Sequence, residues 1–202
     1  MYIQLIVLLI SALTTTTHAT TLEHTLQKNN INPSKYIIDI NINLQTLSLL
    51  RYNSPNNYSK IKDYSISSSK RGLGQIYNTY KTPQGLHKIV AKFGHTAPKY
   101  AIFKSRRHVA TWKPKPRRQH FRDYILTRIL HLSGLESGFN NGHNNNGAFV
   151  DSFARGIYIH GTTMTWKLGT PSSIGCIHMH PDDVIDLFDA VPTGTLVWIH
   201  CV

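Results

Sequence analysis

Long apolar runs, cysteines and charged residues are all scarce in this sequence. After the N-terminus no stretch reaches the roughly 18 apolar residues that a membrane-spanning helix requires, so no such helix is expected there. Charged residues make up only 16% of the 202 residues, but hydrophobic residues make up 41%, which excludes a wholly disordered chain. This length and composition predict one globular domain with a sizeable core.

Acidic residues are outnumbered: 10 Asp and Glu face 22 Lys and Arg, and the formal net charge is +12 at pH 7. Such a surplus predicts a polyanionic neighbour, either nucleic acid, anionic lipid or a cell-wall polymer. The N-terminus decides among them, because Ile3 to Leu13 is an apolar run of signal-peptide length and Ala19 offers a small residue for cleavage. We therefore expect residues 1–19 to export the protein to a periplasm or cell envelope, which argues against nucleic acid. No Lys or Arg precedes the run, so an uncleaved anchor or a buried first strand is the alternative.

Export also sets the first expectation for the two cysteines, Cys176 and Cys201. In an oxidising compartment a single disulfide between them is the simplest arrangement. Twelve histidines invite a metal site, and His178 with His180 forms an i, i+2 pair. No cysteine or carboxylate completes a ligand set at zinc spacing, however, so we expect no bound metal and no cofactor.

Short alternating segments separated by turn residues predict a mainly β domain over residues 34–202, after a polar lead-in over residues 20–33. A helix is expected at Pro181-Asp182-Asp183, because acidic residues and proline suit a helix N-terminus. Strands are expected at Tyr36–Ile42, Leu44–Tyr52, Ile61–Ser67, His87–Lys92, Ile125–Leu132, Gly156–His160 and Leu196–His200.

Basic side chains crowd among prolines and aromatics from Pro98 to Arg122. We expect an insertion at about residues 98–122 that leaves the sheet. It is either a solvated basic loop or a lid or groove wall that attracts an anionic substrate. The Asn-rich stretch from Asn140 to Gly147 is expected to be a surface loop.

One pair of motifs carries the chemistry. His160-Gly161-Thr162 ends an apolar segment, and Cys176 follows His160 by sixteen residues within Ser173-Ile174-Gly175-Cys176. A histidine at the mouth of a strand can accept the proton of a thiol, because the thiolate is the attacking species. A glycine beside the cysteine lets the backbone turn so that N–H groups point at a developing oxyanion. From spacing alone, a packed cysteine and a solvated histidine are the alternative.

At these residues the sequence strongly resembles the L,D-transpeptidase catalytic domain, the YkuD family, whose members remodel bacterial peptidoglycan. The family's His-Gly-Thr and Ser-x-Gly-Cys signatures are matched at residues 160–162 and 173–176. The resemblance implies a curved β-sandwich or open barrel of mixed sheets with one or two short helices. It covers about Tyr36 to Ile199, with further matches at Ser67-Ser68-Ser69, Gly72, Gly74, Thr82-Pro83-Gln84-Gly85, Asp182-Asp183-Val184 and Gly194-Thr195-Leu196-Val197.

The same resemblance implies a cysteine-dependent acyl transfer on peptidoglycan stem peptides. Cys176 would attack the carbonyl at the L-centre of a stem tetrapeptide, release D-Ala and leave a thioester that an amine resolves. His160 would act as general base and then acid, oriented by the backbone carbonyl of Gly161. The N–H groups of Gly175 and Cys176 would form the oxyanion hole. Pairing with His160 is expected to lower the pKa of the Cys176 thiol, and oxidation to a disulfide would abolish the chemistry.

Four further residues are expected to bind substrate: His178, Ser173, Tyr158 and Thr162. Many family members carry His or another polar residue where Ile174 stands, and Arg or Asn where His178 stands, so these positions bear on substrate preference and rate. The expected partners are stem peptides and anionic wall polymer, bound by a monomer. Two alternatives are an L,D-carboxypeptidase that uses water as acceptor, and a non-catalytic basic wall-binding protein with a structural cysteine pair.

Overall fold

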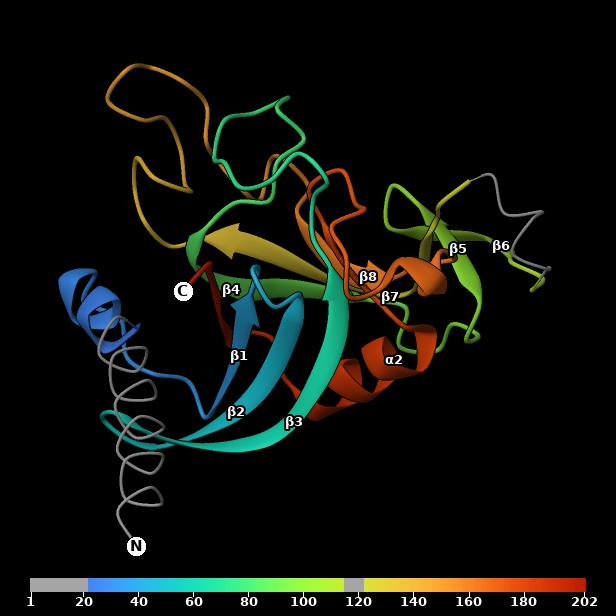
Figure 1. Cartoon of the computed structure of the whole chain (residues 1–202), viewed down its shortest axis with the longest axis horizontal. Helices are drawn as coiled ribbons and strands as arrows, with labels where there is room; N and C mark the ends of the chain where they lie inside the picture. The colour runs from blue at the N-terminus through green and yellow to red at the C-terminus, as the bar shows by residue number, and fades with distance from the viewer. Residues whose placement is uncertain (1–21, 115–121) are drawn as a thin grey trace, which may run out of the picture.

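The computed structural model describes residues 22–114 and 122–202 (Figure 1). The expected signal peptide, residues 1–19, lies outside the described residues, as do residues 115–121 of the basic insertion. No helix in the two described ranges is long and apolar enough to cross a membrane. The elements are β1 (Tyr36–Asn41), β2 (Thr46–Ser54), β3 (Asn57–Ser67), β4 (Gly85–Phe93), β5 (Ala101–Lys104), β6 (Arg107–Thr111), β7 (Ile125–Gly134), β8 (Tyr158–Gly161), the 3-10 helix η2 (Thr165–Lys167), β9 (Ile177–Met179), α2 (Pro181–Ala190) and β10 (Leu196–His200).

The strands form one mixed sheet whose hydrogen bonds run around a ring. Their order is β4-β10-β1-β2-β3-β9-β8-β7-β5-β6, and an additional pairing joins β4 to β7. β1 pairs with β10 and β8 with β9 in parallel, and the remaining pairs between the named strands are antiparallel. The predicted mainly β fold of mixed strands is confirmed, and the β4–β7 pairing closes it into a barrel.

Alternation along the strands places apolar side chains inside this ring. On β1, Ile38 and Ile40 are fully buried in the main core. Helix α2 covers that core with Val184, Leu187 and Phe188, which lie three and four residues apart and therefore on one face of the helix. The helix packs against β7 and β8, the strand that carries His160, so the core supports the candidate site from beneath (Figure 1).

The seven expected strands are confirmed within a few residues, but four short or exposed strand segments were not predicted: β5, β6, β9 and the first half of β3. β9 has three residues and β5 has four, which is too short for an alternating pattern to show. The first half of β3 is largely exposed on both faces, so it also lacks alternation. Exposed pairing of this kind is stabilised by the backbone ladder with β2 rather than by burial.

The expectation that the basic stretch leaves the sheet is wrong for residues 101–111. These residues form the β5–β6 hairpin, and β5 extends the sheet by pairing with β7. Ser105 and Arg106 both have positive φ, 49° and 64°, as the tight type I′ hairpin turn requires. Ala101 and Phe103 are buried against Ile129 on β7, whereas all of β6 is exposed. The hairpin is therefore anchored by the apolar side chains of β5, and its basic residues are exposed to solvent.

The polar lead-in is more ordered than its composition predicts. Residues 22–28 are helical, and Leu22 and Leu26 are 2% and 1% exposed. Their spacing of four residues puts both side chains on one helix face, where they pack in a second cluster with Ile37, Leu86 and Trp198. This cluster lies on the side of β1 opposite to Ile38, so the segment covers the outer face of the sheet.

Candidate active site

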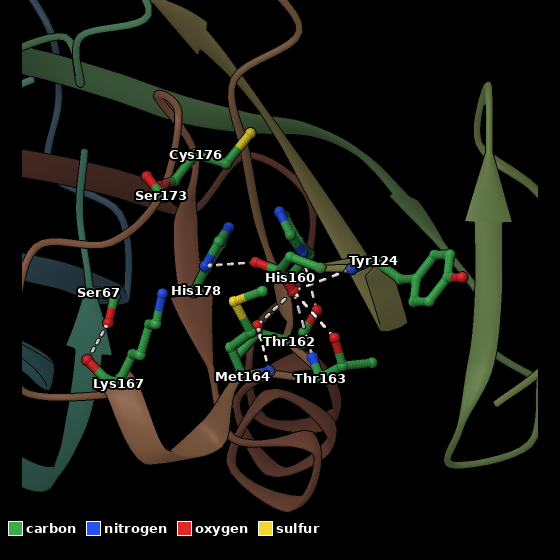
Figure 2. A network of polar contacts seen from close by, with 12 residues as sticks. Ser67, Tyr124, His160, Thr162, Thr163, Met164, Lys167, Ser173, Cys176 and His178 are labelled. Atoms are coloured by element: carbon green, nitrogen blue, oxygen red, sulfur yellow. Dashed lines mark hydrogen bonds and ion pairs between the residues drawn. The ribbon is translucent and has the colours of Figure 1, made fainter. Parts of the chain in front are cut away.

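The parallel pairing of β8 with β9 brings the two sequence motifs together. In the register of this pair, Ile159 lies opposite Ile177 and His160 lies opposite His178. Cys176 directly precedes β9, so the thiol is carried next to the strand that ends in the His-Gly-Thr motif. The intervening loop contains η2 and is tied back to β3, because the Ser67 hydroxyl donates to the Lys167 carbonyl at 2.8 Å (Figure 2).

His160 is 3% exposed and fixed in one orientation. Its Nδ1 lies 2.8 Å from the carbonyl oxygen of Gly161. A carbonyl only accepts hydrogen bonds, so Nδ1 carries the hydrogen and Nε2 keeps a lone pair that can accept a proton. Burial lowers the pKa of His160, while the Gly161 contact and the charge of Asp123 act in the opposite direction. The imidazole is therefore neutral near pH 7 and poised as a base.

Gly161 itself is required by a close approach of two strands. A Cβ atom at this position would lie 2.8 Å from the Leu126 carbonyl oxygen and 2.9 Å from the Thr127 hydroxyl. Real Cβ atoms do not approach backbone oxygen that closely, so any larger residue would push β8 away from β7. The glycine of the His-Gly-Thr motif thus allows β8 to lie close to β7, which keeps His160 buried in the barrel wall.

Cys176 and Cys201 are both free thiols, so the disulfide suggested by composition alone is not formed. The Cys176 sulfur lies 3.5 Å from the carbonyl oxygen of Gly156. Burial raises the pKa of Cys176 to about 11, although the Tyr158 backbone and the charge of Arg155 lower it. The expectation of a lowered thiol pKa is therefore wrong for this structure. Desolvation outweighs the neighbouring cation, and in the described chain the thiol bonds a carbonyl rather than His160.

The turn that carries Cys176 is held by its own hydrogen bonds. The Ser173 hydroxyl donates to the Cys176 carbonyl at 2.6 Å and accepts from the Gly175 N–H at 3.2 Å. Thr82 closes the turn from the other side by donating to the Gly175 carbonyl at 3.0 Å. Gly175 has a φ of +129°, a conformation that side chains rarely adopt. In this state the Gly175 N–H is engaged within the turn, while Ile174 is 63% exposed at its tip.

Two of the four residues expected to bind substrate have their hydroxyls hydrogen-bonded within the protein. Ser173 and Thr162 are each 1% exposed, and both hydroxyls are bonded within the protein. Tyr158 is half-buried and packs edge-on against His131, with ring centroids 4.7 Å apart. Burial raises the pKa of its hydroxyl, and the charge of Arg106 on the β5–β6 turn opposes the shift. The side chain of Tyr158 interacts with the charge of Cys176, and the ring of His178 lies against that of His160.

Asp123 links the two motifs, and the sequence analysis missed it. Its Oδ1 accepts from the Thr162 hydroxyl at 2.6 Å and from the Thr163 N–H at 3.3 Å. Its Oδ2 lies 3.3 Å from His178 Nδ1. The available signal was its isolation, because Asp123 is the only acidic residue between Asp63 and Glu136. A lone carboxylate in such a basic stretch points to a specific partner.

Arg155 is a second residue that the sequence analysis missed. Its guanidinium donates to the carbonyls of Gly74, Gln75 and Lys81 at 3.2, 2.6 and 2.6 Å. These bonds fix the loop that reaches the cysteine turn through Thr82. The charge of Arg155 also acts to lower the pKa of Cys176. One side chain thus shapes the rim of the site and sets part of its electrostatics.

Within residues 22–114 and 122–202 no group of three or more His, Cys, Asp or Glu side chains could hold a metal ion. The chemistry available to the described residues is that of a thiol, two imidazoles and a carboxylate. Their arrangement suits transfer of an acyl group through a thioester.

Comparison with known proteins decides the family. The model of the YkuD family, described as the L,D-transpeptidase catalytic domain, matches residues 35–199. The chain belongs to this family. Two Bacillus subtilis (strain 168) relatives are named "Putative L,D-transpeptidase YkuD" and "Putative L,D-transpeptidase YqjB". The first is 46% identical over 55 residues, which cover 27% of this chain and 34% of the relative. The second is 49% identical over 41 residues, which cover 20% of this chain and 23% of the relative.

A solved structure shares the fold of this L,D-transpeptidase family member. The structure of Bdellovibrio bacteriovorus Bd1075 aligns with a TM-score of 0.51 and 17% identity over 83% of this chain and 48% of that chain. The matched regions thus span about a third or less of the two Bacillus relatives and about half of the Bdellovibrio chain.

Proposed function

We propose that this chain is a peptidoglycan L,D-transpeptidase that transfers an acyl group from the L-centre of a stem tetrapeptide to an amine through a thioester on Cys176. The observation that carries the proposal is the β8–β9 pairing, which sets a buried, oriented His160 beside the strand that follows Cys176. Membership of the family supplies the substrate class.

In the first half-reaction the thiol and imidazole begin as a neutral pair. The pKa of Cys176 is raised and that of His160 is lowered, so a preformed thiolate–imidazolium pair is not favoured at rest. His160 Nε2 therefore takes the thiol proton as the sulfur attacks the carbonyl carbon. The bond to D-Ala then breaks, and His160 returns the proton to the departing amine. This step requires the sulfur to turn from Gly156 towards His160.

The oxyanion of the tetrahedral intermediate would be held by the N–H groups of Gly175 and Cys176. The Gly175 N–H must exchange the Ser173 hydroxyl, 3.2 Å away, for the substrate oxygen. Loss of one donor to such an oxyanion typically costs on the order of 3 kcal/mol of barrier. The proposed hole thus forms as the substrate enters.

Residues 1–19 are proposed to direct export, leaving a monomeric catalytic unit over residues 34–202 in the cell envelope. The exposed hairpin residues Lys104, Arg106 and Arg107 would hold anionic wall polymer. Attraction between such exposed charges is screened over about 8 Å at physiological ionic strength, so this association should weaken with added salt.

The test is incubation of the purified protein with a disaccharide tetrapeptide, followed by mass spectrometry. A cross-linked dimer with released D-Ala supports the proposal. A trimmed tripeptide alone would identify an L,D-carboxypeptidase that uses water as acceptor. No reaction by wild-type protein that binds the sacculus would favour a non-catalytic wall-binding role and overturn the proposal.

A further inference from the structure

A second imidazole lies beside the proposed base. His178 on β9 is 5% exposed, and its ring centroid lies 4.8 Å from that of His160, with the ring planes at 58°. Figure 2 shows the two rings side by side, both extending towards the part of the site that carries Cys176. The proposed first half-reaction uses only His160, which leaves this buried imidazole without a role.

Asp123 fixes the chemical state of His178. Its Oδ2 lies 3.3 Å from His178 Nδ1, while its Oδ1 is held by the hydroxyl and N–H groups of Thr162 and Thr163. The contact is an ion pair rather than a hydrogen bond, and the negative carboxylate favours the tautomer with the hydrogen on Nδ1 and the lone pair on Nε2. His178 and His160 therefore share one tautomer, with both basic nitrogens unbound by these anchoring contacts.

Two imidazoles this close cannot readily both be charged. Burial lowers the pKa of His178, proximity to His160 lowers it further, and Asp123 opposes both effects. The charged groups around the pair are Asp123 from the segment before β7, His160 from β8 and Arg155 near the thiol. While His160 holds the thiol proton, repulsion keeps His178 neutral. Once His160 has given that proton to D-Ala, this repulsion no longer opposes protonation of His178, and the charge of Asp123 favours it.

We propose that His178, positioned by Asp123, accepts a proton from the incoming ammonium in the second half-reaction. This inference rests on the proposed function and adds a second base to it. The ammonium gives one proton to His178 Nε2, which releases it to solvent, and the resulting amine nitrogen bonds to the thioester carbon. The surplus proton of that nitrogen then passes to neutral His160 as the carbon–sulfur bond breaks and the electron pair returns to Cys176. His160 finally reprotonates the thiolate, so the two imidazoles are never charged together.

The experiment separates the two half-reactions. The full protein is given a disaccharide tetrapeptide and a small primary amine from pH 6 to 10, and both D-Ala release and the ratio of amine adduct to hydrolysed tripeptide are measured. With protein in excess, so that each molecule turns over once, His178→Asn should lose at least about tenfold in adduct ratio at pH 7, a larger loss than in D-Ala release, as for a lost general base. The ratio should recover as the pH approaches the amine pKa, about 10, because free amine needs no base.

Two further variants complete the design. His180→Asn is the matched control, because His180 caps the N-terminus of α2, where asparagine serves equally well, and it should leave the ratio unchanged. Asp123→Asn should lower the ratio as His178→Asn does, since an amide can donate to Nδ1 and move the hydrogen to Nε2. This second variant keeps the inference testable if His178→Asn folds poorly.

Three results would overturn the inference. Equal losses of D-Ala release and adduct at every pH would make His178 a structural residue. A lowered ratio that high pH does not restore would make it a binding contact for the amine rather than a proton acceptor. Wild-type protein that releases no D-Ala would contradict the proposed function and this inference with it, whereas D-Ala release with an unaltered ratio in His178→Asn contradicts the inference alone.

Discussion

His87 and His160 are two buried imidazoles that the chain anchors in the same way. His87 Nδ1 lies 3.0 Å from the Gly85 carbonyl, and His160 Nδ1 lies 2.8 Å from the Gly161 carbonyl. His87 also holds the better-formed partner, because its Nε2 lies 3.0 Å from the Ser152 hydroxyl. Judged by hydrogen bonds alone, His87 and Ser152 look more like a catalytic pair than His160 and Cys176 do.

Exposure separates the two pairs. His87 and Ser152 are both 0% exposed, so no substrate can reach the hydroxyl. Cys176 is partly exposed on a glycine-containing turn immediately before β9. A closed hydrogen bond between buried groups stabilises the fold, whereas a reactive group has to leave room for a third atom. The looser geometry around Cys176 is therefore the one suited to chemistry.

The largest expected effect on activity comes from removing each of the two candidate nucleophiles, Cys176 and Ser152, in turn. Cys176→Ala should reduce D-Ala release by at least about a thousandfold, because removing a covalent nucleophile leaves only binding and oxyanion stabilisation. Ser152→Ala should keep activity and instead lower the free energy of unfolding by about 1–3 kcal/mol, the cost of leaving His87 Nε2 unsatisfied. Mass spectrometry of the reaction and urea unfolding measure the two effects.

Cys201→Ala is the matched control for the thiol, and it should retain the wild-type rate. Activity that survives in Cys176→Ala and vanishes in Ser152→Ala would reverse the comparison.

Alkylation tests whether Cys176 is a protonated thiol or a thiolate at rest, because only the thiolate reacts. With a pKa of about 11, Cys176 is almost wholly protonated at pH 7. Its labelling by iodoacetamide should rise about tenfold per pH unit from pH 7 to 10, following the thiolate fraction. Intact-mass measurement of Cys201→Ala isolates this thiol. A labelling rate that levels off below pH 8 would instead reveal an activated thiolate at rest.

Removing each imidazole should separate stability from activity. His87→Ala creates a cavity and strands the Ser152 hydroxyl, so it should lower the free energy of unfolding by about 3 kcal/mol. Its folded fraction should retain activity within about tenfold of wild type, since His87 touches no reacting atom. His160→Ala should lose activity as Cys176→Ala does. Equal activity losses in His87→Ala and His160→Ala would mean that the strand carrying His87, β4, also positions the catalytic residues.

Most of the barrel was predictable because its longer strands are apolar or alternating segments bounded by turn residues. Ile38 and Ile40 flank the polar Asp39, and Val184, Leu187 and Phe188 repeat at helical spacing. Strands of three or four residues carry no such period, and the β5–β6 hairpin was hidden by its charge. Its turn at Ser105 and Arg106 has the backbone of an Asn-Gly turn without those residues, so turn chemistry gave no warning.

Site residues that belong to a sequence motif were predictable. Properties that depend on burial or on contacts between distant segments were not. His160, Gly161 and Cys176 follow from the resemblance and local chemistry. The raised pKa of the thiol depends on how deeply the turn is buried in the barrel wall, and the spacing of residues in the sequence does not predict that burial. Asp123 lies 39 residues before Thr162 along the chain, and only the β7–β8 pairing brings that region together.

The last expected effect, which changes no residue, is the contribution of His87 to the pH dependence of stability. Burial lowers its pKa from 6.5 to about 4 in the folded protein. Between these values the unfolded chain binds a proton that the folded protein does not, so stability from this group is complete above pH 6.5 and is lost as the pH falls to 4. At 1.36 kcal/mol per pKa unit the loss is about 3 kcal/mol. His160 has a pKa shifted in the same direction, so wild-type protein should weaken further.

The difference between wild type and His87→Gln isolates the group, because glutamine does not titrate. Urea unfolding at pH 7 and pH 4 should show that the variant loses less stability over this range than wild type does. Identical losses would mean that His87 accepts a proton while folded, with Ser152 turning its hydroxyl away. In that event the pair would be open to solvent exchange, and burial would no longer distinguish it from His160 and Cys176.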